Sequence, residues 1–279
     1  MNNFHSPKEV AEAYDNISVS KAKNSITNLF ILGVLAGIYI AFAGFASQTI
    51  SYTIKNPGLS KFASGAVFPV GLILVVLAGA ELFTGNNLMI IGFMDKKISF
   101  SELLRNWIVV YIANFIGSVL FAFLISRSGL FDSAGGLLGA TAIKTAIAKV
   151  SLPFSQALIR GLLCNIMVVL AVWMATAAKD IASKISAIWF PIMLFVMSGF
   201  EHSIANMYFI PAGIFAKSNA DYLKAGQIEA ASLSKLNLSG LFANLVPVTV
   251  GNILGGAIII GLSYWYVYRY TSDKINFKK

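Results

Sequence analysis

The sequence predicts an all-α integral membrane protein with six transmembrane helices. Of its 279 residues, 57% are hydrophobic and only 12% are charged, which is about half the charged share of an ordinary soluble domain. The apolar residues gather in six runs, each at least about as long as the roughly 20 residues that cross a bilayer. Two runs share one polar interruption, and lipid excludes such groups unless they are paired or line a cavity. We therefore expect a helical bundle with a polar pathway inside it.

The first 26 residues form a separate polar stretch, and we assign 1–26 to an amphipathic helix on the cytoplasmic surface. Ser6-Pro7-Lys8-Glu9 is a capping box with proline at the first helical position. Val10, Tyr14 and Ile17 then share one face. The stretch lacks the apolar core of a signal peptide, so we expect it to be retained. Anchorage to the membrane and gating of a pore mouth are its two alternative roles.

The membrane domain is predicted over 27–272, followed by a short cytoplasmic tail at 273–279. The spans are expected at 27–54, 62–94, 103–125, 154–178, 185–216 and 241–268. The second and fifth are too long for one crossing and carry the polar interruptions. We therefore expect each of them to be two half-helices joined by irregular backbone. A continuous helix with one buried polar turn is the alternative.

The interruptions belong to an internal repeat. Gly79-x-Glu81-x-x-x-x-Asn86 in the second span matches Gly199-x-Glu201-x-x-x-x-Asn206 in the fifth. Asn114-Phe115-Ile116-Gly117 is likewise echoed by Asn252-Ile253-Leu254-Gly255, and Gly33-x-x-x-Gly37 by Gly161-x-x-x-Asn165. Three spans thus repeat as three, about 27–127 and 153–272. Because three is odd, the second copy enters the membrane from the opposite side, which predicts an inverted repeat with an aquaporin-like arrangement.

Composition excludes several classes of function. Cys164 is the single cysteine, and His5 and His202 are the two histidines, so we expect no disulfide, metal site or cofactor. The net charge of +9 comes from residues scattered in connections beside apolar spans, which indicates membrane topology and not nucleic-acid binding. The excess of Lys and Arg falls on the side that holds both ends of the chain. Both termini are therefore expected in the cytoplasm, with the protein in the cell (inner or plasma) membrane.

The interrupted segments supply the candidate site residues. Glycine permits a tight turn at Gly85, and a broken helix leaves backbone groups for polar side chains. We expect a structural role at the helix breaks, with the carboxylates accepting from backbone N–H groups, for the residues Glu81, Gly85, Asn86, Glu201 and Asn206.

Three other polar residues are candidates for hydrogen bonding within a pore. Thr84 could be a neutral donor on the pathway. The unperturbed pKa of a histidine lies near neutrality, so His202 could donate a hydrogen bond or pass a proton. Asn165 could share their network. A satisfied core histidine is the alternative for His202. Bulky apolar residues nearby would form either ordinary core or dry constrictions of the pore, namely Phe68, Leu72, Leu82, Phe83 and Phe195.

Several longer motifs resemble the formate/nitrite transporter family. They are Gly79-Ala80-Glu81-Leu82-Phe83-Thr84-Gly85-Asn86, Arg160-Gly161-Leu162-Leu163-Cys164-Asn165, Leu170-Ala171-Val172-Trp173, Ser198-Gly199-Phe200-Glu201-His202-Ser203-Ile204-Ala205-Asn206-Met207 and Pro247-Val248-Thr249-Val250-Gly251-Asn252.

The resemblance implies a homopentamer in the lipid bilayer, with one pore in each protomer. The pore would pass small monovalent anions such as formate, nitrite or hydrosulfide. By position, His202, Thr84 and Asn165 would line it, the five apolar residues would form its slits, and Lys149 would attract anions at a mouth. A solvated loop charge is the alternative for Lys149.

The sequence therefore predicts a channel, not an enzyme, with proton coupling through His202 as a hypothesis. A neutral-solute channel of the water or glycerol type is the first alternative, although its paired Asn-Pro-Ala motifs are absent. A hydrolase using Ser198 or Ser203 with His202 is the second. Neighbouring residues on a helix do not face one another, which disfavours that nucleophile and base pair.

Overall fold

The computed structural model describes residues 3–271, so the predicted tail at 273–279 lies outside the described residues. The regular structure of the described part is helical, which confirms the all-α class. Six of its helices are long and apolar enough to cross a membrane, namely Ile26–Ser51, Pro57–Gly79, Phe100–Arg127, Phe154–Ala177, Ile181–Ser198 and Leu238–Tyr270.

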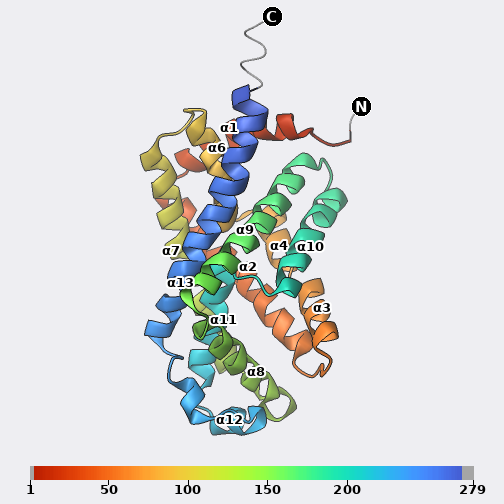
Figure 1. Cartoon of the computed structure of the whole chain (residues 1–279), viewed down its shortest axis with the longest axis vertical. Helices are drawn as coiled ribbons and strands as arrows, with labels where there is room; N and C mark the ends of the chain where they lie inside the picture. The colour runs from red at the N-terminus through yellow and green to blue at the C-terminus, as the bar shows by residue number, and fades with distance from the viewer. Residues whose placement is uncertain (1–2, 272–279) are drawn as a thin grey trace, which may run out of the picture.

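Figure 1 shows an elongated bundle whose two ends are closed by shorter helices. At one end, α1 (Pro7–Lys23) lies beside the last turns of the C-terminal helix, and its predicted capping box is formed. At the other end lie α8 (Ser133–Val150) and α12 (Ala220–Gly226). We call these the α1 end and the α8 end.

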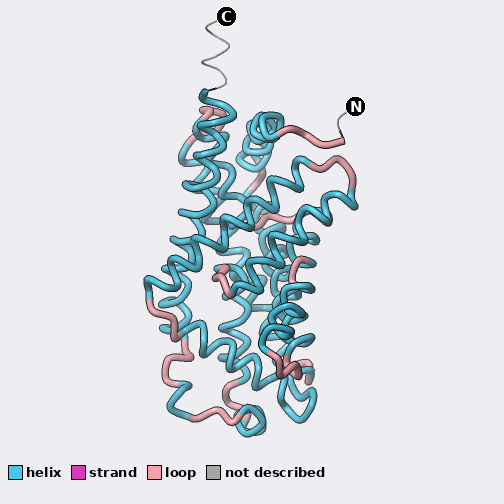
Figure 2. Tube along the Cα trace, turned by 45° about the vertical axis from the view of Figure 1, so that its right-hand side comes forward, coloured by secondary structure: helices cyan, strands magenta, loops and turns pink. Residues whose placement is uncertain are grey.

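The second predicted span is a series of short pieces. These are α3 (Pro57–Val67), α4 (Val70–Leu74), η1 (Val75–Gly79), α5 (Phe83–Asn86), η2 (Asn87–Met89) and α6 (Ile90–Met94). The backbone is not helical at 80–82, and Gly79, directly before this segment, has φ 83°. The fifth predicted span is α10 (Ile181–Ser198) and α11 (Ser203–Ala216), with Gly199 between them at φ 71°. Figure 2 shows loop segments within the height of the bundle as well as at its ends.

The remaining spans pack as two tight pairs, α2 (Ile26–Ser51) with α7 (Phe100–Arg127), and α9 (Phe154–Ala177) with α13 (Leu238–Ile253). Glycine allows the backbones to meet, because a Cβ at Gly37 would collide with Asn114 O and one at Gly255 with Leu162 O. Beyond α13 the helix continues as η5 (Leu254–Leu262), α14 (Ser263–Trp265) and η6 (Tyr266–Tyr270).

Helix α8 was not among the elements expected from the sequence. The connection after the third span holds η3 (Leu130–Asp132) and then α8, which packs along α11. A further short helix, η4 (Ala230–Leu233), lies in the connection before α13. Lys149, considered above as a possible loop charge, is thereby on a packed helix.

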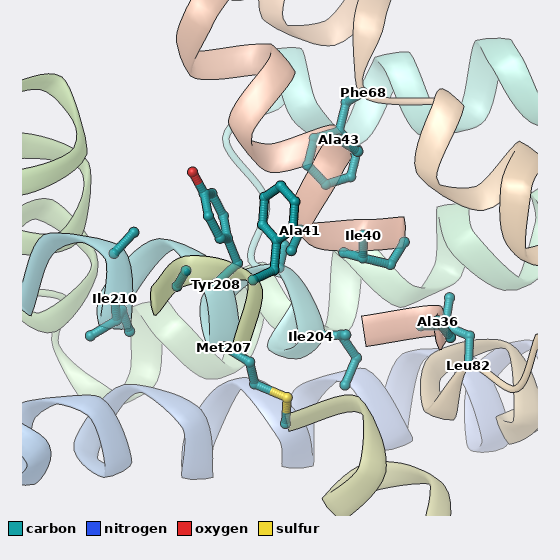
Figure 3. Close-up of a cluster of buried hydrophobic side chains, with 14 of the residues drawn as sticks. Ala36, Ile40, Ala41, Ala43, Phe68, Leu82, Ile204, Met207, Tyr208 and Ile210 are labelled. Carbon is teal, nitrogen blue, oxygen red and sulfur yellow. The ribbon is translucent and has the colours of Figure 1, made fainter. Parts of the chain in front are cut away.

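Buried apolar side chains join α2 to α11 at the centre of the bundle. Figure 3 shows part of this cluster, with Phe68 beside Ala43 and Leu82 beside Ala36; the other labelled side chains are Ile40, Ala41, Ile204, Met207, Tyr208 and Ile210. The apolar cluster lies beside the two non-helical segments, so their positions are fixed by packing on both sides.

Candidate functional site

A cavity of about 210 Å³ enters the bundle from the α8 end. Lys149, Glu201 and His202 line it together with the rings of Phe68 and Phe195, which pack edge to face with centroids 5.5 Å apart. Further polar lining residues are Ser47, Gln48, Ser51, Ser64, Thr141, Thr145 and Asn206. The cavity thus changes from polar walls to an apolar pair of rings beside His202.

A second cavity, of about 370 Å³, lies on the side of the α1 end. Lys21 and Glu81 line it together with the apolar Leu72 and Leu82. Its other lining residues include Tyr14, Gly85, Asn86 and Val172. Both cavities thus have one lysine and one glutamate in the wall, but the second has fewer polar lining residues than the first.

His202 and Thr84 form a buried hydrogen-bonded pair. Thr84 Oγ1 lies 2.9 Å from His202 Nε2, and both residues are at most 3% exposed. His202 is also the N-cap of α11, because its Nδ1 accepts from Ala205 N at 3.1 Å. A ring nitrogen that accepts carries no proton, so in the neutral ring the proton is on Nε2 and points to Thr84. Thr84 is then an acceptor for His202, and its own hydroxyl proton is available.

The two glutamates form matched networks. Glu201 accepts from Lys149 Nζ at 3.0 and 3.2 Å, and from Asn206 Nδ2 at 2.6 Å. Glu81 accepts from Lys21 Nζ at 2.8 and 2.9 Å, and from Asn86 Nδ2 at 2.6 Å. The sequence-based expectation of backbone N–H partners was therefore wrong for both carboxylates. Each carboxylate instead joins a lysine at a cavity wall to an asparagine on the helix after the break.

Each asparagine is tied further to a neighbouring span. Asn86 Nδ2 also donates to Asn106 Oδ1, and Asn206 Nδ2 to Asn244 Oδ1, both at 2.8 Å. These residues are at most 3% exposed. Because buried amides are costly when unpaired, the shared bonds hold the short helices α5 and α11 against α7 and α13.

Two further asparagines clamp the non-helical segments. Asn114 Oδ1 accepts from Phe83 N at 3.0 Å, and its Nδ2 donates to Glu81 O and Gly33 O at 2.9 and 2.7 Å. Asn252 makes the same three bonds, with Ser203 N, Glu201 O and Gly161 O, at 2.9, 3.0 and 2.8 Å. Each clamp satisfies the backbone groups that an interrupted helix leaves open.

Three of the predicted pore residues, Thr84, Asn165 and Phe83, line neither of these two cavities. Asn165 is fully buried and its Nδ2 donates to Asn87 Oδ1 at 2.9 Å and to Asn252 O at 2.7 Å. Its third bond, to Thr84 O at 3.3 Å, links it to the His202 pair from behind. Phe83 packs edge to face on Trp107 and Tyr111. Asn165 and Phe83 therefore lie outside the two cavities and pack against the segments that form their walls.

Sequence reasoning missed Lys21 and Tyr14 as lining residues. No separate role was predicted for Lys21. The repeat carried a signal for it, because Lys21 precedes Gly33 by twelve positions and Lys149 precedes Gly161 by the same twelve. Extending the repeat toward the N-terminus would have paired the two lysines.

The serine hydrolase alternative lacks its geometry. Ser203 Oγ is buried without a hydrogen-bond partner, and both ring nitrogens of His202 are engaged by Ala205 and Thr84. A nucleophile needs its base within hydrogen-bond reach. Among residues 3–271, no group of three or more His, Cys, Asp and Glu side chains could hold a metal ion.

Comparisons with known proteins agree with this arrangement. The formate/nitrite transporter family model matches residues 8–266. A probable formate transporter of Methanothermobacter thermautotrophicus is 42% identical, covering 95% of this chain and 97% of its own length. The formate channel FocA of Escherichia coli is 36% identical, with 96% and 95% covered.

Solved structures of channels are similar to this fold over most of the chain. A pentameric formate channel with formate bound matches with a TM-score of 0.79 at 37% identity, covering 87% of this chain and 97% of that one. An FNT family ion channel matches with a TM-score of 0.79 at 28% identity, over 92% and 98%. The matched relatives are channels and transporters, not enzymes. From its sequence and its fold alike, the chain belongs to the formate/nitrite transporter family.

Proposed function

We propose that the protein is a membrane channel for small monovalent anions of weak acids, with formate as the first candidate and nitrite and hydrosulfide as the others. The observation that carries this proposal is the pair of cavities, each with a lysine in its wall, on either side of the His202 and Thr84 pair. The formate channels among its relatives support formate as the substrate.

Lys149 and Lys21 attract anions to the two cavities, and their charge is only partly offset. Their side chains are 14% and 25% exposed, so each stays accessible to solvent while bound to its glutamate. Beyond them an anion meets the constrictions Phe68 with Phe195, and Leu72 with Leu82. Loss of hydration there opposes a charged ion strongly, whereas the neutral conjugate acid passes at a lower cost.

His202 offers the anion a hydrogen bond between the constrictions. Its Nε2–H group points to Thr84. His202 can exchange this hydrogen bond for one to an oxygen of the carboxylate or of nitrite. Complete transfer of the proton from a neutral ring would leave an unfavourable imidazolate. Proton coupling therefore requires the imidazolium, and the imidazolium requires Nδ1 to release the Ala205 N–H. Hydrogen-bond donation comes first, and proton transfer is the further step.

The membrane domain is an inverted repeat with broken second and fifth helices. Support comes from the matched bonds of Asn114 and Asn252 to equivalent backbone groups. It also comes from Tyr111 and Thr249, which precede these asparagines by three positions and hydrogen-bond each other at 2.8 Å. The repeat extends to α1 and α8, because each carries its lysine twelve positions before the matching glycine. Each copy therefore includes a flanking helix at its own mouth.

The channel assembles as a homopentamer, as the matched pentameric formate channel does. Both termini are in the cytoplasm, so that the α1 end is the inner mouth and the α8 end the outer mouth. Residues 27–272 form the channel domain and 1–26 the surface helix.

Flux into proteoliposomes tests the proposal. Purified protein is compared for uptake of formate, nitrite, hydrosulfide, chloride and glycerol across a pH series, beside His202→Asn and Thr84→Val. We expect weak-acid anions to exceed chloride and glycerol, and His202→Asn to lower formate uptake at least tenfold. Glycerol uptake above formate uptake and indifferent to His202 would establish the neutral-solute channel instead. An unchanged proton-coupled flux in His202→Asn would contradict only the proton role.

A further inference from the structure

Arg269, near the end of the C-terminal helix, joins parts of the chain that are far apart in sequence. Its Nη2 donates to Asp15 Oδ2 of α1 at 2.8 Å, and its Nε to Asp95 Oδ2 at 2.6 Å. Trp265, four residues earlier, donates from Nε1 to the other Asp95 oxygen at 2.6 Å. The side chains of the three charged residues are only 13–16% exposed. Such partly buried, charge-assisted bonds are stronger than exposed ion pairs.

Two other charges surround this cluster at longer range. Lys97 Nζ lies 4.0 Å from Asp15 Oδ2, and Glu12 Oε1 lies 3.9 Å from Arg269 Nη1. Both side chains are about half exposed, so solvent screens them. Arg269 and the Lys21–Glu81 pair are therefore the two close ion-pair links between α1 and the bundle, and Arg269 is the one that joins α1 to the C-terminal helix.

The link through Arg269 matters because α1 contributes two residues to the α1-side cavity. Tyr14 stacks on Trp173 with centroids 5.7 Å apart, and Lys21 bonds to Glu81. Tyr14 and Lys21 both line the α1-side cavity. At the opposite end Lys149 is on α8, which packs along the buried helix α11. The lysine of the α1 end is instead supplied by a terminal helix that is tied to η6 at the other end of the chain.

We propose that Arg269 is a positioning residue for anion permeation, which holds α1 in place and thereby keeps Lys21 at the wall of the α1-side cavity. The proposal rests on the proposed function as an anion channel. It assigns the C-terminal helix a role at one mouth only. Loss of Arg269 releases α1, takes Lys21 away from Glu81, and lowers the flux of anions through the pore.

Thiol accessibility tests whether Arg269 holds α1. Val10 on the buried face of α1 is 0% exposed, so Val10→Cys reports undocking to a membrane-impermeant maleimide. Native Cys164 is also 0% exposed and reports general unfolding. We expect Arg269→Ala to raise labelling at position 10 at least tenfold without labelling Cys164. Arg269→Lys should restore part of the protection, and the control Arg127→Ala, which removes an exposed arginine elsewhere, should change nothing.

Formate flux tests whether Arg269 acts through Lys21. Formate uptake into proteoliposomes is measured for Arg269→Ala, Lys21→Ala and the double variant. We expect both single variants to lose about the same severalfold share of uptake, and the double variant to lose no more. Unchanged uptake in Arg269→Ala, or single losses that multiply in the double variant, would overturn the proposal, as would unchanged labelling of position 10.

Two controls keep the results separable. If Arg269→Ala exposes Cys164, Asp15→Ala replaces it, because that change removes the acceptor on α1 and leaves Arg269 on Asp95. If the unmodified protein carries no formate above empty vesicles, the proposed function fails, while the labelling of position 10 still decides whether Arg269 holds α1.

Discussion

The carboxylates of Glu81 and Glu201 each accept hydrogen bonds from two different side chains, a lysine and an asparagine. Glu201 neutralises part of the charge of Lys149 and at the same time accepts from Asn206 on the following helix. A carboxylate that accepts from several donors holds them in fixed positions. The lysine therefore presents its charge to the cavity from a defined place, which a free flexible side chain would not do.

Replacing the carboxylate should be costly at this site. Glu201→Gln keeps the shape but leaves the buried Lys149 charge unpaired, so we expect a loss of stability on the order of 3 kcal/mol. Glu81→Gln should lose less, because Lys21 is more exposed than Lys149. Thermal unfolding in detergent measures both, with the exposed Glu229→Gln as the control. Equal midpoints for Glu201→Gln and Glu229→Gln would contradict the buried-pair interpretation.

Among the helices, hydropathy predicted the six membrane spans but not the shorter helix α8. The six apolar runs were found because bilayer thickness sets a length that sequence reveals directly. The α8 helix was missed because it is shorter than a span and interrupted by Gly135, Gly136 and two lysines, so that its stability comes from packing on α11. The lysine partners of Glu81 and Glu201 were missed because they come from helices 60 and 52 residues away in sequence, and only the packing of those helices brings them close.

The docking of α1 should depend on pH through Asp15. Burial raises the pKa of Asp15 to about 6, and the neighbouring Asp95 adds to this although Arg269 and Lys97 oppose it. Burial acts to raise the pKa of Asp95 also, but hydrogen bonds from Arg269 and Trp265 outweigh it and the pKa is lowered. Docked α1 thus binds a proton at Asp15 more tightly than undocked α1, and docking becomes more favourable as the pH falls from 7 to 5.

Labelling of Val10→Cys measures this effect, with rates normalised to a free-thiol peptide at each pH. We expect protection to increase severalfold between pH 7 and pH 5. Asp15→Asn should abolish the dependence, because Asp95 stays ionised throughout this range and the more distant Glu12 is half exposed. A faster normalised rate at pH 5 would show that another group controls docking.

At the scale of the whole molecule, the proposed repeat makes a quantitative prediction. Asn114→Ala and Asn252→Ala each leave one backbone N–H and two carbonyl groups without their side-chain partner. Each unsatisfied buried group costs about 1–3 kcal/mol, so we expect large and similar losses of stability from the two variants. Chemical or thermal unfolding compares them with Asn237→Ala, which removes an exposed helix cap and one exposed bond to Ser234 O and should cost about 1 kcal/mol. Strongly unequal losses from the two clamps would argue against equivalent halves.

The lysine and glutamate pairs also fix an order of events during synthesis. Lys149 precedes Glu201 by 52 residues, and Lys21 precedes Glu81 by 60. At about 5–20 residues per second, each lysine is added to the chain roughly 3–12 s before its glutamate. Both mouths of the pathway are therefore completed only after the intervening helices have been made, and a chain stalled between the partners carries a lysine whose final position is still undefined.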